Sequence, residues 1–193
     1  MRPVTETPAR RGTVLAMLST LGLILVLPLA TSAIPAAAEE REVDCSEVKL
    51  AMSDPGYDTS CFKDNFMFAG MGGTGRTDVL EATSVDGSHF LTALNIVAQG
   101  QVILTRVPLH KQLESMFQLE QMSNWRNGHA VGSMDTSEFD ADVKTIPSHC
   151  VGFQHYFGPE HGGYRGVTVG FGCSRSSREM VYGALQKLDI HSD

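Results

Sequence analysis

The sequence is poor in positive charge, and after its N-terminal segment the positive residues do not cluster. Its 193 residues contain 15 Lys and Arg against 22 Asp and Glu, which gives a formal net charge of −7. Proteins that bind nucleic acids need a basic surface facing the phosphate backbone. The composition therefore predicts no nucleic-acid partner.

Motifs of common hydrolases and metalloenzymes are also missing. Neither G-x-S-x-G nor H-E-x-x-H occurs in the sequence. No two cysteines have the C-x₂₋₄-C spacing of a zinc site, or the C-x-x-C spacing of redox and haem-attachment motifs. We therefore predict no cofactor and no metal, and the sequence assigns no catalytic residue.

Two short motif matches occur in contexts that do not support their usual functions. Residues 70–75 fit G-x-G-x-x-G, but residues 76–80 predict a turn into a strand, whereas a dinucleotide site needs the start of a helix. Residues 46–49 fit S-x-x-K, but the S-D-N and K-T-G elements of penicillin-interacting enzymes are missing. A flexible loop and a chance match are the better interpretations.

The N-terminal part of the chain has the features of an export signal. Three arginines precede an almost entirely apolar run at residues 14–30, and small residues follow it. This order predicts a signal peptide and a mature protein in the periplasm or outside the cell. The apolar run is close to the minimum that spans a bilayer, so an uncleaved signal segment is the one membrane anchor we consider.

The small residues offer two cleavage sites, after Ala33 and after Ala38. The acidic pair that follows Ala38 favours the second site. This gives a signal peptide over residues 1–38 and a single exported domain over residues 39–193. Cleavage there removes three arginines and one glutamate, so the formal charge falls from −7 to −9.

Four cysteines remain after cleavage, and an even number in an oxidising compartment indicates two disulfides. Of the three pairings, we predict Cys45 with Cys61 and Cys150 with Cys173, because each pair closes a short loop. The chain-entropy argument gives each bridge about 3 kcal/mol of stabilisation.

Hydrophobic patterns predict an α+β fold, in which a small antiparallel sheet is packed by two helices and stapled by disulfides. Asp86-Gly87 suits the turn of a hairpin. The last helix begins with a capping box, Ser176-Ser177-Arg178-Glu179. The predicted strands are 62–69, 79–85, 90–97 and 101–107, although 90–98 also fits a buried helix, and the predicted helices are 46–52, 109–123 and 177–188.

The segment between Cys150 and Cys173 predicts an antiparallel hairpin, because a turn-forming island at residues 158–163 separates two alternating stretches. If the two cysteines face each other, Phe153 lies opposite Gly170 and Phe157 lies opposite Gly166. Aromatic rings would then cover bare glycine backbone, which explains these residues without a ligand.

A non-catalytic binding or envelope-associated module is the function we expect, with an unknown envelope component or a small ligand as partner. Residues near the hairpin tip combine aromatic faces with hydrogen-bond donors, as interface anchors do. Trp125 lies in a polar stretch and either joins them or belongs to the core. The candidate binding residues are Tyr156, His161, Tyr164 and Arg165.

A small periplasmic hydrolase or metal-dependent enzyme is the alternative. Its site would be assembled from scattered residues such as His129, Asp135, His155 and His161. His149 and His155 share one face of the predicted strand but are about 20 Å apart at about 3.3 Å per residue, so they cannot hold one ion together.

Overall fold

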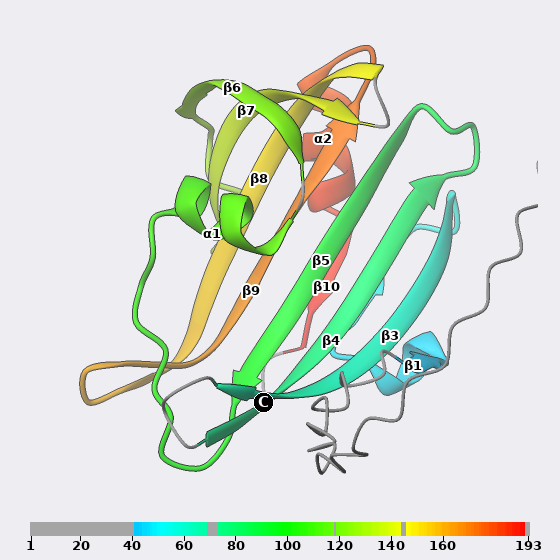
Figure 1. The fold of residues 1–193 in the computed structure, drawn as a ribbon. Coiled ribbons are helices and arrows are strands. Elements are labelled where there is room, and N and C mark those ends of the chain that lie inside the picture. Colours follow the sequence, from blue (N-terminus) through cyan, green and yellow to red (C-terminus); the bar gives the residue numbers. More distant parts are fainter. Residues whose placement is uncertain (1–40, 69–72, 118, 144–145, 192–193) are drawn as a thin grey trace, which may run out of the picture. The chain divides into compact units, whose positions relative to one another are not determined.

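The structure is a computed structural model that describes residues 41–68, 73–117, 119–143 and 146–191 (Figure 1). The predicted signal peptide and both cleavage sites lie outside the described residues. All described residues belong to one compact unit.

Antiparallel strands dominate this unit (Figure 1). Eight of them form one sheet in the order β1-β3-β4-β5-β9-β8-β7-β6, and β10 pairs with β2 in a separate two-stranded sheet. The strands are β1 (Arg41–Val43), β2 (Leu50–Met52), β3 (Tyr57–Phe68), β4 (Gly73–Ser84), β5 (His89–Ala98), β6 (Glu120–Asn127), β7 (Asp135–Val143), β8 (Ile146–Glu160), β9 (Gly163–Ser174) and β10 (Leu188–Ile190).

The predicted α+β class, with a small sheet packed by two helices, is wrong. The described part of the chain is mostly strand, and its only α-helices are α1 (Leu109–Met116) and α2 (Arg178–Leu185), each eight residues long. The helix predicted over 109–123 ends at Met116, and the chain continues as β6. Apolar residues at helical spacing misled the prediction, because β6 contains two register shifts that break the regular alternation of a strand.

Other boundaries also differ from the predictions. The predicted helix 46–52 is a 3₁₀ turn at Cys45–Glu47 followed by β2. In place of the predicted strand 101–107, the structure has a single bridge between Leu104 and Tyr164. The hairpin around Asp86-Gly87 is confirmed as β4 and β5.

The two helices cover opposite faces of the large sheet (Figure 1). On α1, Leu113 would contact a Cβ placed on Gly152, whereas on α2 Val181 would contact one placed on Gly172. Gly172 pairs with Val151, the neighbour of Gly152, so these glycines face opposite sides. Neither helix in the described residues is long and apolar enough to span a membrane.

Each face has its own hydrophobic core. The core under α2 includes Leu80, Leu91, Phe153, Val181 and Leu185, and the core under α1 includes Leu109, Leu113, Phe139, Val169 and Phe171. We call these sides the α2 face and the α1 face.

The hairpin of β8 and β9 has the predicted register. Cys150 pairs with Cys173, Phe153 with Gly170, and Phe157 with Gly166. The rings of Phe153 and Phe157 lie where a Cβ on the opposite glycine would be. Disulfides join Cys150 to Cys173 and Cys45 to Cys61, and they fit an oxidising compartment.

Candidate functional site

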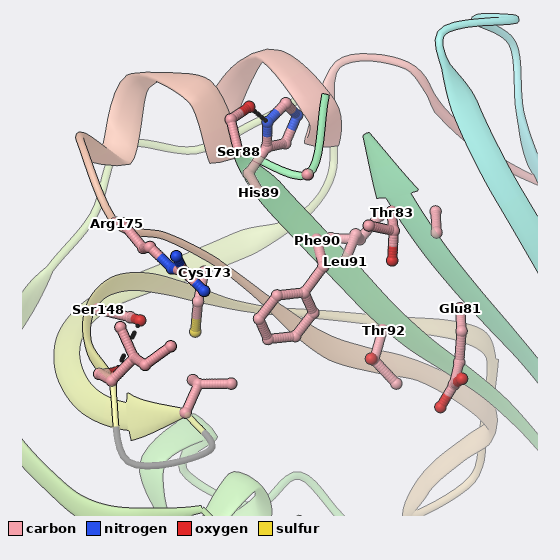
Figure 2. A pocket seen from close by; sticks show the side chains of 14 residues that line it. Glu81, Thr83, Ser88, His89, Phe90, Leu91, Thr92, Ser148, Cys173 and Arg175 are labelled. Carbon is pink, nitrogen blue, oxygen red and sulfur yellow. Dashed lines mark hydrogen bonds between the residues drawn. The ribbon is translucent and has the colours of Figure 1, made fainter. Parts of the chain in front are cut away.

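A groove on the α1 face has the size and lining of a small-molecule site. Its volume is about 360 Å³, and β4, β5, the end of β9 and the adjoining ends of β7 and β8 line it. Ligand pockets typically enclose about 300–1,000 Å³ and combine apolar walls with a few polar groups. We call it the Phe90 groove, after the residue between its two sides (Figure 2).

The register of the sheet brings the groove residues together. Phe90 pairs with Thr83 on β4 and with Cys173 on β9, so all three side chains point to one face. The Phe90 ring packs edge-on against Phe171, with the ring centroids 5.7 Å apart. Val143 and Ile146 add apolar wall at the end of β7 and β8.

Polar and charged groups line both sides of Phe90. Figure 2 shows Arg175 and Ser148 on one side of the ring, and Glu81 and Thr92 on the other. Arg175 and Glu81 are exposed, and neither side chain has an ion-pair or hydrogen-bond partner among the described residues. The groove therefore offers a guanidinium and a carboxylate on opposite sides of an aromatic surface.

A chain of hydrogen bonds lies at one end of the groove. The Ser88 hydroxyl donates to Asp86 Oδ1 at 2.7 Å and lies 2.9 Å from His89 Nδ1. His89 Nε2 in turn lies 2.8 Å from the hydroxyl of Tyr57. Hydrogen bonds from the Ser88 side chain and backbone lower the pKa of Asp86 to about 2. Burial lowers the pKa of His89, which favours a neutral imidazole.

The donor and acceptor roles in this series of hydrogen bonds argue against Ser88 as a nucleophile. The Ser88 proton points to the Asp86 carboxylate, so His89 Nδ1 must be the donor to Ser88 Oγ and Nε2 must accept from Tyr57. A general base must instead accept the proton of the nucleophile. These groups satisfy one another in the hairpin turn, where the backbone N–H of Ser88 also bonds Asp86.

A second serine lies beside a histidine and a carboxylate, but it is not available for catalysis either. His149 pairs with Asp140 on one side and with Ser174 on the other, and His149 Nδ1 lies 3.0 Å from Asp140 Oδ1. Ser174, however, is only 2% exposed. Its hydroxyl accepts from the backbone N–H groups of Ser176 and Ser177, so it supports the start of α2.

The candidate binding residues near the hairpin tip make contacts within the protein. The Tyr156 hydroxyl accepts from the backbone N–H of Val107, and its ring lies 4.9 Å from that of Tyr164. Arg165 forms an ion pair with Glu160, and His161 lies in the exposed turn. A partner surface formed by Tyr156, His161, Tyr164 and Arg165 stays a prediction.

The residues of the predicted alternative enzyme occupy separate places. His129 stacks on Tyr182, Asp135 forms an ion pair with Arg106, and the His155 ring lies near Phe157. Within the described ranges, no group of three His, Cys, Asp or Glu side chains could hold a metal ion. Trp125 stacks on Phe139 at 4.4 Å, so it belongs to the core under α1.

Sequence reasoning did not identify the Phe90 groove. Its lining residues extend from Glu81 to Arg175, and strand register alone brings them together. An arginine directly after a strand that carries a disulfide was the one available signal. Comparison with known protein families, characterised proteins and solved structures finds no match for this chain.

Proposed function

We propose that this protein is an exported, non-catalytic binding module that holds a small ligand in the Phe90 groove. The predicted signal peptide and the two disulfides support a location in the periplasm or outside the cell. The observation that carries the proposal is the concave apolar surface around Phe90, with the unpaired Arg175 at its side.

The groove favours a ligand with an aromatic or other flat apolar body and one anionic group. The body would lie on Phe90 and against Val143 and Ile146. The anion would pair with Arg175, whose planar guanidinium suits a carboxylate. Glu81, on the opposite side, disfavours a second negative group, so we expect a monoanion to bind better than a dianion.

Catalysis is not part of this proposal, because we find no activated nucleophile among the described residues that line the groove. The Ser88 proton is directed to Asp86, and the low pKa of Asp86 makes that carboxylate a weak base. A bound ligand should therefore leave the groove chemically unchanged.

Titration of the ¹⁵N-labelled domain, residues 39–193, with 4-phenylbutyrate tests the proposal by NMR. We expect shifts of the backbone amides of Phe90, Thr92, Ser148 and Arg175, with a Kd near the millimolar range for so small a probe. Phenethylamine, which has a positive in place of a negative group, should bind more weakly.

Arg175→Gln removes the charge that would hold the anion. We expect it to weaken 4-phenylbutyrate binding at least about tenfold, the effect of losing one charge-assisted hydrogen bond. Lys111→Gln is the control, because it removes an exposed positive charge on α1 without touching the groove. Shifts outside the groove, or equal binding by Arg175→Gln, would contradict the proposed function.

A further inference from the structure

The α2 face has a second pocket, at the end of the sheet away from the Asp86-Gly87 turn. It encloses about 420 Å³, and three of its lining residues are Arg76, Asn95 and Arg165. Phe157 and Val97 give it an apolar side. None of these residues belongs to the Phe90 groove.

Asn95 is a buried polar residue that lines this pocket. It is only 2% exposed, and its Oδ1 accepts a hydrogen bond from the Thr168 hydroxyl at 3.0 Å. Asn95 Nδ2 makes no hydrogen bond to another described residue, so the amide keeps a donor for a ligand in the pocket.

A fully buried carboxylate orients Arg76. Asp78 is 0% exposed, and its Oδ1 lies 3.4 Å from Arg76 Nε. Its Oδ2 accepts from the backbone N–H of Lys49 at 3.2 Å. A contact through Nε leaves the two Nη groups of Arg76 for a ligand, and this edge of a guanidinium binds oxyanions in bidentate fashion.

Arg165 lines the pocket as well, and hydrogen bonds hold its guanidinium. Its Nε bonds Glu160, and its Nη1 donates to the backbone oxygen of Gly100 at 2.8 Å. Before any ligand arrives, Arg165 is held by hydrogen bonds and Arg76 by its ion pair with Asp78, which lowers the ordering cost of binding. Such convergence of donors is unusual in a domain with a formal charge of −9.

We infer that this pocket binds a phosphate group, with Arg76, Arg165 and the Asn95 amide as its donors. The pocket is wide enough for a free phosphate ion or for the phosphate of a monoester whose apolar body contacts Phe157 and Val97. Both ligands offer the same oxyanion to the same donors. The inference is independent of the Phe90 groove, since the two sites share no residue.

NMR titrations of the ¹⁵N-labelled domain with inorganic phosphate and with phenyl phosphate, each at up to about 10 mM and constant ionic strength, test the inference. Shifts at Arg76, Asn95 and Arg165 with both probes indicate that free phosphate is sufficient. Shifts with phenyl phosphate alone indicate a monoester. Shifts with neither, or shifts that map elsewhere, would overturn the inference.

Two variants remove donors of the proposed site, and each is designed to leave no buried group of the fold unpaired. R76Q/D78N keeps the net charge and avoids an unpaired buried carboxylate, and it should weaken phosphate binding at least about tenfold. Asn95→Asp keeps the acceptor for Thr168 and turns a negative oxygen toward the ligand. R106Q/D135N, which neutralises an exposed ion pair elsewhere, is the matched control. Unchanged phosphate binding by either folded variant would show that the pocket is not the site.

Discussion

Gly170→Ala tests the packing of the central strand β9 directly. A Cβ at this position would lie 2.2 Å from the backbone oxygen of Thr92, 2.6 Å from the Phe153 ring and 2.9 Å from the Cα of Ala93. Two of these three atoms belong to the backbone of β5. A methyl group could fit only if β5 and β9 moved apart.

The matched variant is Gly166→Ala, on the same strand and the same face. There the three nearest atoms all belong to the ring of Phe157, which is half-buried and can rotate away. Overpacking costs about 1–3 kcal/mol. We assign the upper end, about 3 kcal/mol, to Gly170→Ala and about 1 kcal/mol to Gly166→Ala, because backbone yields less than a side chain.

Thermal unfolding of the oxidised domain separates the two variants. For a domain of about this size, each kcal/mol lowers Tm by about 2–4 °C, so we expect losses of about 6–12 °C and about 2–4 °C. Gly183→Ala, in α2 with nothing within 4 Å of the new Cβ, should raise stability by about 0.5–1 kcal/mol. Equal losses at positions 170 and 166, or a wild-type Tm for Gly170→Ala, would refute the packing argument.

Three further measurements follow from the structure. Arg178→Met leaves Glu138 and Asp140 without their half-buried partner, and it should lower the free energy of unfolding in urea by about 3 kcal/mol. Arg126→Met, which removes an exposed partner of Glu138, should lower it by less than about 1 kcal/mol. Equal losses would contradict this prediction. Burial lowers the pKa of His89, so its contribution to stability is complete above the unfolded value of about 6.5 and declines as the pH falls through the folded pKa. His89→Asn should therefore flatten the plot of unfolding free energy against pH in that range. An unchanged plot would assign the pH dependence to other groups. Mild dithiothreitol should reduce Cys45–Cys61 before Cys150–Cys173, because Cys45 is partly exposed and both cysteines of the second bridge are buried. Peptide mapping of the alkylated protein gives the order of reduction.

The hairpin of β8 and β9 could be predicted because its signals are local. Turn residues separate two alternating stretches, and the two cysteines define the register. β7 could not be predicted in this way. Glu138 and Asp140 make it too acidic for a typical strand, and their compensation comes from Arg178, which is remote in sequence.

The candidate site was harder to predict than the fold around it. Phe90 looks like an ordinary core residue in a strand, and Arg175 looks like an ordinary surface residue in a loop. Their juxtaposition depends on the pairing of β5 with β9, a contact between distant segments of the chain. No local sequence pattern predicts this pairing, so the groove can be recognised only once the register of β5 and β9 is known.

The asymmetry of β9 explains why the α1 face keeps an open groove. Its α2 face carries glycine at positions 166, 170 and 172, so the Phe153 ring and Val181 of α2 pack directly on its backbone. Its α1 face carries Val167, Val169 and Phe171, which fill the space beside the sheet. The short helix α1 lies mainly against β7, β8 and β9 and does not extend over β4 and β5. The apolar surface of Phe90 beyond α1 therefore remains accessible, beside the exposed side chain of Arg175.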